Sequence, residues 1–284
     1  MHLRRLVRVG VNPRNPVQYL ACCGVFEIVA RFDEGATGRW LVDNTTEFVL
    51  ESQFEEASLL DCLAGSLADW SCWSSEYSET GETIRLNVVF SLMGESITLG
   101  LDWWYETLDG QRKIKKSAWK MYAGQQTVNG ITSEMVKKAG ELAAGAPPET
   151  LTNLISLKTG MKGRFGLDPR SSRNALDAGF SANDLNLSVE TYPFAETLAV
   201  IGAQLFFPHR TRPSGGNEST RGWIEKGAFR YGVWTIALPI MLARMAACCA
   251  GFEDEGSIFA LRSARASRDK YSNLSMASHI TLRR

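Results

Sequence analysis

The sequence predicts a mixed α+β protein, in which an antiparallel sheet with a hairpin is surrounded by helices. Three observations lead to this class. Apolar and polar residues alternate over 84–90 and again over 97–103, on either side of the turn Met93-Gly94-Glu95, as in the two half-buried strands of a hairpin. Elsewhere, apolar residues recur three and four positions apart, as on the buried face of a helix. The 284 residues are 44% hydrophobic and 22% charged, which is typical of a globular protein able to bury a substantial core.

The first part of the chain is expected to contain a strand and a long helix joined by a polar loop. Val7, Val9 and Val11 alternate with other residues and predict the strand. The helix is expected to begin after Asn15, because Asn15 is an amide cap, a proline follows at the first helical position, and Gln18 is placed to complete a capping box. The other elements expected in this region are strands at 39–42 and 47–50 and a helix at 54–70.

The chain is expected to divide at Gly145-Ala146-Pro147-Pro148, which interrupts the helical pattern before it. Residues 1–145 then form a sheet-containing N-terminal part, and residues 146–284 form a more helical C-terminal part with late strands, packed together as one compact domain. Asp168 is expected to cap a helix over 170–178, because Pro169 occupies the first helical position. The remaining expected elements are helices at 126–144, 151–157, 193–207 and 239–250, loops at 158–164 and 209–222, and strands at 229–238, 258–262 and 279–282.

The formal net charge is zero, but the charges are unevenly distributed. Up to Leu101 there are 7 Lys and Arg against 14 Asp and Glu, and from Asp102 onward there are 24 against 17. This asymmetry predicts a basic working face in the later part and an acidic, solvated or partner-facing surface in the earlier part. Because the sequence has neither a long uncharged apolar run nor the apolar core of a signal peptide, a cytoplasmic location without membrane contact is expected.

The six cysteines are predicted to be small buried hydrophobic residues rather than metal ligands. They are Cys22, Cys23, Cys62, Cys72, Cys248 and Cys249. Adjacent cysteines on a helix point in different directions, and the sequence has no Cys-x-x-Cys spacing, so we expect no metal and no cofactor.

The strongest functional candidate in the sequence is the stretch 99–128, where a strand leads into a basic segment. Five cations fall within nine residues and are interleaved with two aromatic rings and followed by two amides. These residues are Arg112, Lys113, Lys115, Lys116, Lys120, Trp119, Tyr122, Gln125 and Gln126. Cations neutralise phosphates, rings stack on bases and amides bind base edges, so the stretch predicts a nucleic-acid interface. The alternative is a solvated connection between strand and helix, with Trp119 in the core.

A second set of cations, Lys158, Lys162, Arg164 and Arg170, is expected to position a nucleic-acid backbone, with a solvated loop as the alternative. Catalytic motifs are not found, because none of the three histidines belongs to a recognisable pair and hydrolase, zinc-protease, phosphate-loop and dinucleotide motifs are missing. Asp168, Asp177, Asp184 and Glu196 could form a two-metal nuclease cluster. Helix capping by Asp168 explains that residue better, so we expect a protein that is not an enzyme.

Several segments of the sequence together resemble one known family. They are NPVQYLACCGVFEIVARF, the strand LDWW followed by WKMYAGQQ, RFGLDPRSSRNALDAGFSANDL, YPFAETLAVIGAQLFFP and RYGVWTIALP. In this order, over nearly the whole chain, they resemble the compact large-subunit-type protein of type I-U (also called I-G) CRISPR effector complexes, which are Cascade-like and serve antiviral defence. The resemblance implies a non-catalytic subunit of an RNA-guided surveillance complex.

The resemblance also implies partners and roles. A large subunit of this type binds target DNA near the protospacer-adjacent motif and helps recruit a helicase-nuclease, so the expected partners are other effector subunits, guide RNA, target double-stranded DNA and that nuclease. Arg112, the nearby lysines, Lys162, Arg164 and Arg170 are then expected on phosphates, and Gln125 or Gln126 near base edges. Asn12, Asn15 and Trp119 are weaker candidates for motif reading or guide contact, and for Asn15 we favour the helix-cap alternative. A guide-RNA-handling subunit of the same kind of complex is the main alternative function.

The chain departs from the family in one respect, because it is short for a large subunit. The role of the helical module that holds the displaced strand in longer relatives is therefore not assigned to it.

Overall fold

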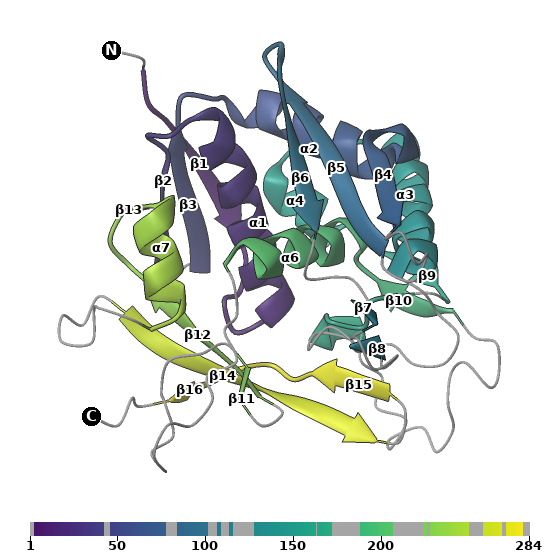
Figure 1. The fold of residues 1–284 in the computed structure, drawn as a ribbon. Coiled ribbons are helices and arrows are strands. Elements are labelled where there is room, and N and C mark those ends of the chain that lie inside the picture. Colours follow the sequence, from purple (N-terminus) through teal and green to yellow (C-terminus); the bar gives the residue numbers. More distant parts are fainter. Residues whose placement is uncertain are drawn as a thin grey trace.

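The computed structural model describes twelve stretches of the chain. They are residues 3–42, 46–77, 84–101, 107–108, 114–115, 128–162, 164–171, 188–206, 224–225, 228–249, 258–268 and 271–280. Within them, helices pack against antiparallel sheets, which confirms the predicted mixed α+β class (Figure 1).

The first sheet covers the N-terminal helix and combines strands from both ends of the chain. Its antiparallel order is β1-β3-β2-β13, where β1 is Arg5–Gly10, β2 is Thr37–Val42, β3 is Thr46–Ser52 and β13 is Leu238–Pro239. Val7 and Val9 are buried and their neighbours in β1 are exposed, which is the alternation that the sequence predicts. Leu238 pairs with Gly38, so a strand from beyond residue 145 completes a sheet of the earlier part.

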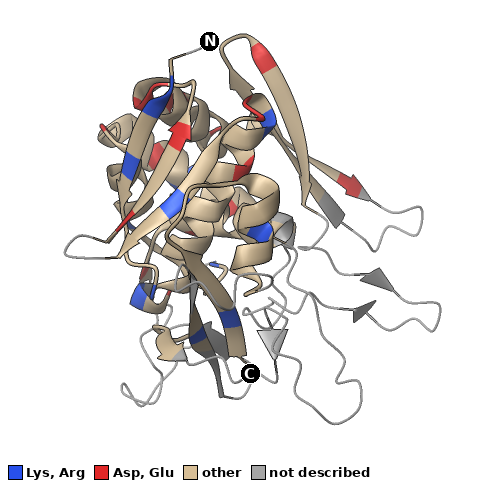
Figure 2. Ribbon diagram, turned by 90° about the vertical axis from the view of Figure 1, so that its left-hand side faces the viewer, with Lys and Arg blue, Asp and Glu red and all other residues tan. Residues whose placement is uncertain are grey.

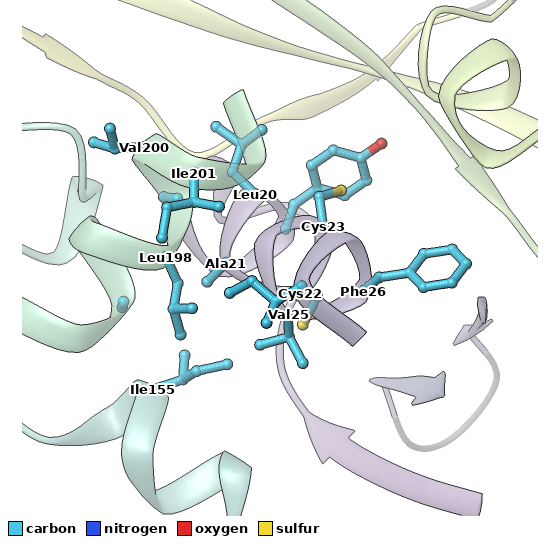
Figure 3. Packing of buried hydrophobic residues seen from close by; sticks show 14 of the residues in the cluster. Leu20, Ala21, Cys22, Cys23, Val25, Phe26, Ile155, Leu198, Val200 and Ile201 are labelled. Atoms are coloured by element: carbon cyan, nitrogen blue, oxygen red, sulfur yellow. The ribbon is translucent and has the colours of Figure 1, made fainter. Parts of the chain in front are cut away.

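The centre of the fold is the crossing of α1 (Pro16–Phe32) with α6 (Pro193–Leu205) (Figure 1). Gly24 and Gly202 face each other there, because a Cβ atom on either glycine would overlap a backbone carbonyl of the opposite helix. Figure 3 shows the apolar side chains at this crossing, including Ala21 and Leu198, with Ile155 of α4 (Leu151–Ser156) beside them. Almost the whole circumference of α1 is buried, as expected for a helix that is apolar on all sides.

Aromatic side chains connect α1 to the first sheet and to β12 (Ala228–Trp234). The Tyr19 ring stacks on Trp40, and its hydroxyl donates a 2.8 Å hydrogen bond to the Gly232 carbonyl. Trp234 Nε1 donates a 2.8 Å bond to the Gly38 carbonyl. These bonds satisfy buried polar groups that would otherwise be costly, so they fix how the three elements pack together.

The predicted hairpin is confirmed and forms two of the three strands of a second sheet. In its order β4-β5-β6, β4 is Trp73–Tyr77, β5 is Ile84–Leu92 and β6 is Glu95–Leu101. Leu92 pairs with Glu95, and the intervening Met93 and Gly94 have positive φ angles, as a tight hairpin turn requires. The helices α2 (Glu56–Ala68) and α3 (Val128–Gly145) pack beside this sheet.

A third sheet lies below the crossing of α1 and α6 in Figure 1, and short elements complete the described fold. Along the path β11-β12-β14-β15, β11 is Ile224–Glu225, β14 is Ile258–Arg268 and β15 is Tyr271–Leu274, while β16 (Ser278–Ile280) also pairs with β14. The helix α7 (Ile240–Ala247) packs on β12. The short elements are the strand pairs β7 (Thr107–Leu108) with β8 (Ile114–Lys115) and β9 (Thr159–Met161) with β10 (Val189–Thr191), and the 3-10 turns Trp70–Cys72 and Pro169–Ser171.

The sequence under-predicts strand in the later part of the chain. Beyond residue 145, the described residues contain eight strands alongside three α-helices. The strand β14 continues to Arg268, six residues beyond its predicted end, through the segment Ser-Ala-Arg-Ala-Ser-Arg, which lacks the apolar alternation of a strand. The predicted loop at 158–164 contains β9, because Thr159–Met161 finds a partner in β10. These strands form because they pair with segments that are distant in the sequence, and the local sequence pattern does not predict such pairing.

Four of the cysteines, Cys22, Cys23, Cys62 and Cys249, are buried as predicted, and all six are free thiols. Burial raises the pKa of Cys22 and Cys23 well above the ordinary value and that of Cys62 to about 11, so these thiols stay protonated.

In the upper part of Figure 2, basic and acidic residues occur on neighbouring described elements. The arginines at the start of the described chain pair with acidic residues. Arg4, just before β1, lies 2.7 Å from Asp33. In β1, Arg5 lies 3.0 Å from Glu55 and Arg8 lies 3.2 Å from Glu47. None of the described helices has the length and apolar character needed to cross a membrane.

Candidate nucleic-acid interface

Most of the basic cluster predicted from the sequence lies outside the described residues. This applies to Arg112, Lys113, Lys116, Trp119, Lys120, Tyr122, Gln125 and Gln126. Lys115 is the second residue of β8, and its backbone pairs with Thr107 of β7. The described flanks of the cluster agree with the prediction, since β6 leads toward it and α3 follows it. Contact between the cluster and nucleic acid stays a prediction.

The second basic set is described, and its members have different surroundings. Lys162 is exposed directly after β9, and Lys158 forms a 2.9 Å ion pair with Glu190 of β10. Arg164 is half-buried, and burial lowers the pKa of its guanidinium while the nearby Glu196 carboxylate opposes that shift. The structure therefore brings Arg164 inside the fold and leaves Lys162 at the surface.

Arg170 is held by two neighbours in a fixed orientation. Its guanidinium donates to both oxygens of Asp168, with Nη2 at 2.7 Å from Oδ2, and lies 3.5 Å from the centre of the Tyr192 ring. A planar guanidinium paired with a carboxylate and stacked on a ring has most of its charge compensated. In the described structure Arg170 thus orders the segment that carries it.

A buried carboxylate, Glu196 of α6, anchors the segment between the two arginines. Its oxygens accept hydrogen bonds from the backbone N–H groups of Phe165 at 3.1 Å, Gly166 at 3.3 Å and Asp168 at 3.4 Å. Burial is the largest cause that raises the pKa of Glu196, to about 7, and the neighbouring Asp168 carboxylate adds to it. Arg164 and the backbone donors act in the opposite direction.

We expect the stability of the protein to fall as the pH rises through the titration of Glu196. The pKa of Glu196 is about 7 in the folded protein against 4.5 for the free side chain, so between these pH values the folded state binds more protons than the unfolded chain. The contribution of protonated Glu196 to the free energy of unfolding is complete below about pH 4.5, and it is lost as the pH rises through about 7. It amounts to about 3 kcal/mol, since one pKa unit corresponds to about 1.4 kcal/mol.

Urea unfolding of the wild type and of Glu196→Gln between pH 4.5 and 8 measures this contribution. The glutamine keeps an oxygen for the N–H groups of Phe165 and Gly166, which both donate to the same carboxylate oxygen, and it cannot titrate. The difference in free energy of unfolding between the two proteins should therefore change across this range. A constant difference would contradict the assigned titration.

Asp168 links this anchored segment to the N-terminus of α1. Its Oδ1 accepts a 2.9 Å bond from the backbone N–H of Arg170 at the start of the 3-10 turn, and a 3.1 Å bond from Nδ2 of Asn15. The predicted capping role of Asp168 is confirmed at this turn, while the predicted helix beyond residue 171 lies outside the described residues. Asn15 is buried and caps α1, because its Oδ1 accepts from the N–H groups of Val17 and Gln18.

The predicted nuclease cluster is described only in part. Asp168 and Glu196 are near each other, and both use their oxygens in the hydrogen bonds described above. Asp177 and Asp184 lie outside the described residues. Where side chains are described, no group of three or more His, Cys, Asp or Glu residues is arranged to hold a metal ion.

The loop before α1 is held by side chains from within it, which corrects one prediction. Gln18 does not complete a capping box with Asn15; its Oε1 accepts a 2.8 Å bond from the backbone N–H of Asn12. The N–H of Asn15 is unavailable to it because that group donates to the Asn12 carbonyl at 2.9 Å. Asn12 Oδ1 in turn accepts a 3.0 Å bond from the N–H of Arg14.

The same loop is also held from the third sheet. The Tyr231 hydroxyl of β12 donates a 2.6 Å bond to the Pro13 carbonyl, and the N–H of Ala277 donates a 2.7 Å bond to the Arg14 carbonyl. Asn12 and Arg14 are themselves exposed. The loop therefore presents two polar side chains on a backbone that is fixed from several directions.

A pocket of about 810 Å³ opens beside this loop. The loop, the ends of β2 and β3, and the paired strands β14 and β16 form its walls. The lining residues are Gly10, Val11, Asn12, Pro13, Arg14, Gln18, Val42, Thr46, Leu261 and His279. It adjoins the weaker candidate Asn12, whereas Asn15 lies buried behind the loop.

Sequence reasoning named Asn12 but missed Arg14, Gln18 and His279 as parts of one site. The polar loop Asn-Pro-Arg-Asn-Pro, which contains Arg14 and lies just before Gln18, was a usable local signal for these two residues. Nothing local indicates His279, because it reaches the pocket through the pairing of β16 with β14, where it lies opposite Leu261. Comparison of the chain with protein-family models, curated proteins and solved structures finds no match.

Proposed function

We propose that this chain is a non-catalytic, cytoplasmic subunit of a type I CRISPR RNA-guided surveillance complex, which binds target DNA near the protospacer-adjacent motif and helps to assemble the complex. Guide pairing would read the target sequence in such a complex, while protein groups hold backbones and read a short motif. The other effector subunits, the guide RNA, the target duplex and a recruited helicase-nuclease are its partners in this proposal.

The observation that carries the proposal is that four of the five segments on which the resemblance rests converge in the described structure. Asn15 of the first segment bonds to Asp168 of the third, and the N–H of Asp168 donates to Glu196 of the fourth. Tyr231 of the fifth segment donates a hydrogen bond to Pro13, two residues before the first segment. Segments spread over more than 200 residues thus order one exposed loop. A resemblance over residues that cooperate in this way supports a shared architecture more strongly than isolated motifs would.

The proposal gives the two sets of cations different roles. Lys113, Lys115, Lys116 and Lys120 bind phosphates, with Arg112 beside them, and Gln125 or Gln126 lies near base edges. Within the second set, exposed Lys162 contacts backbone phosphate. Arg164 and Arg170, which lie against Glu196 and Asp168, order the segment.

Reversal of Lys115 and Lys116 to glutamate in the assembled complex should weaken target-duplex binding about tenfold or more. Each lost phosphate contact should also reduce the slope of log Kd against log salt by about one unit. Electrophoretic mobility shifts over a salt series, with guide-loaded complex and duplex target, measure both quantities.

The matched control is the reversal of Lys137 and Lys138 on α3, which changes the net charge by the same amount and also involves adjacent lysines. It should leave the salt slope unchanged. Equal weakening by both double variants would mean a nonspecific charge effect, and unchanged binding after the Lys115 and Lys116 reversal would defeat the proposal. A loss of guide-RNA binding with intact duplex binding would favour the guide-handling alternative.

A further inference from the structure

The pocket beside the loop before α1 presents hydrogen-bond donors. The oxygens of two lining amides are already used, because Asn12 Oδ1 accepts from the N–H of Arg14 and Gln18 Oε1 accepts from the N–H of Asn12. Each of these oxygens faces a backbone N–H, which can only donate, so the assignment of oxygen and nitrogen is fixed. The NH2 groups of Asn12 and Gln18 are left as donors to a ligand, beside the guanidinium of Arg14.

The charge of Arg14 is not compensated by the fold. Its side chain is exposed and makes no ion pair with the residues that the structure describes, whereas Arg5 and Arg8 on the preceding strand each pair with a glutamate. Among the lining residues that the structure describes, none is acidic. This described lining, with amide donors and a guanidinium, suits an anionic ligand rich in acceptors, of which phosphate is the commonest.

One apolar side chain of the described lining, that of Val42, offers surface to a flat ring. Val11, Pro13 and Leu261 also line the pocket, but they are buried and contribute little contact surface. Val42 is 38% exposed, which is high for a valine and leaves a hydrophobic surface at the rim. The volume of about 810 Å³ lies within the range of about 300–1,000 Å³ found for pockets that take small molecules and cofactors.

The loop is ordered before any ligand arrives. The backbone groups of residues 12–15 are bonded to Gln18, Asn12 and Tyr231 side chains and to the N–H of Ala277. Binding therefore need not bear the entropy of fixing this backbone, and the side chains of Asn12 and Arg14 extend from a backbone in a defined position.

We infer that this pocket binds one nucleotide unit of a single-stranded nucleic acid, with Arg14 on its phosphate, the amides of Asn12 and Gln18 on acceptors of its base, and Val42 against the base face. The identity of the strand as guide RNA or displaced DNA rests on the proposed function; the nucleotide chemistry of the pocket does not. The described residues of this site are not members of the basic cluster at 112–126, which the proposal above assigns to duplex phosphates.

The test measures binding of fluorescein-labelled oligouridine and oligothymidine, about ten nucleotides long, to the full-length protein by fluorescence anisotropy. Arg14→Ala should weaken binding about 10- to 100-fold, as expected for loss of a charge-assisted contact, and reduce the salt slope by about one unit. Arg5→Ala removes the same charge from an arginine paired with Glu55 and should leave binding unchanged. Tighter binding of one oligomer supports the pocket and identifies the kind of strand.

A second variant separates recognition from folding. Asn12→Asp keeps an oxygen for the N–H of Arg14 and replaces the free NH2 donor by an acceptor, so the loop stays intact while the pocket loses a donor. It should weaken oligouridine binding with an unchanged thermal midpoint. In competition, uridine monophosphate should displace the oligomer at concentrations at which ribose 5-phosphate and inorganic phosphate do not.

Three results would overturn the inference: equal binding by Arg14→Ala and Arg5→Ala, full binding by Asn12→Asp, or displacement by inorganic phosphate as effective as by the nucleotide.

The experiments distinguish failure of the pocket inference from failure of the proposed function. If the Lys115 and Lys116 reversal weakens duplex binding while Arg14→Ala has no effect on oligomers, the proposed function stands and the pocket inference fails. If Arg14→Ala weakens oligomer binding and the lysine reversal changes nothing, the pocket stands and the duplex role fails.

Discussion

Gly202→Ala is expected to destabilise the protein by about 3 kcal/mol or more and to leave much of it insoluble. A Cβ atom at residue 202 would overlap the carbonyl oxygen of Leu20 and come within 2.8 Å of the backbone nitrogen of Gly24. Both neighbours are backbone atoms inside α1, so they cannot rotate away as a side chain would. The two helices would have to separate, which opens packing along the whole crossing.

Gly24→Ala should have a similar effect from the other side of the crossing, because its Cβ would overlap the Leu198 carbonyl. Overpacking in cores typically costs about 1–3 kcal/mol, and contact with rigid backbone on a central helix places these variants at or beyond the upper end. Each substitution alone forces the same separation of the helices. The loss of stability in the double variant should therefore be smaller than the sum of the losses in the two single variants.

The control for both variants is Gly65→Ala on α2. Gly65 is also in a helix, but a Cβ there has no neighbour within 4 Å. Alanine is the better helix former by about 0.5–1 kcal/mol, so this variant should be as stable as the wild type or slightly more stable. Thermal and urea unfolding of the three variants measure the difference. Equal midpoints for Gly202→Ala and Gly65→Ala would show that the helices do not touch at these glycines.

The contrast between these glycines shows what the sequence can and cannot predict. The start of α1 was predictable because Asn15 and the following proline are local signals that act within one turn. The hairpin was predictable because its pattern and its turn lie within twenty residues. Gly202 lies where two helices cross and Gly65 does not. The local sequence pattern cannot predict this difference, because it does not indicate which helices cross.

The candidate site was predictable to a similar extent. Asn12 and Arg164 stand out as polar or basic residues in glycine- and proline-containing segments, and the structure places the segments that carry them beside each other through the Asn15–Asp168 bond. The failure of the capping box at Gln18 has a physical reason, since the Asn12 N–H competes for the same oxygen. Tyr231 and His279 reach the site from strands that are distant in the sequence. Predicting them as parts of the site requires knowledge of the register of β12, β14 and β16.

Glu27→Ala is expected to be the second severely destabilising substitution. Glu27 is 1% exposed in the middle of α1, and its carboxylate accepts two 2.5 Å bonds from Arg244 of α7 and one 3.0 Å bond from Arg31. Removing one partner of a buried ion pair costs about 3–5 kcal/mol, because the other charge stays in a poorly solvated place. Arg244 is 24% exposed, so its charge would be only partly hydrated.

A double-mutant cycle tests whether the cost comes from the unpaired charge or from lost packing. Glu27→Leu alone and Arg244→Met alone should each destabilise strongly, since each leaves a charged partner near the helix interface. The double variant removes both charges and should recover much of the loss, because a buried pair is often replaceable by apolar side chains of similar volume. Arg31→Ala is the control, since Arg31 is 50% exposed and an exposed pair contributes about 0–1 kcal/mol.

The outcome of this cycle also bears on how α7 is attached. If the double variant is as unstable as the single variants, the Glu27–Arg244 pair contributes shape and hydrogen bonds that leucine and methionine cannot replace. If it recovers, the pair mainly selects the position of α7 against α1, while apolar contacts supply the stability. The second result is expected, because Ala243, Ala246 and Ala247 bury the inner face of α7 without help from the ion pair.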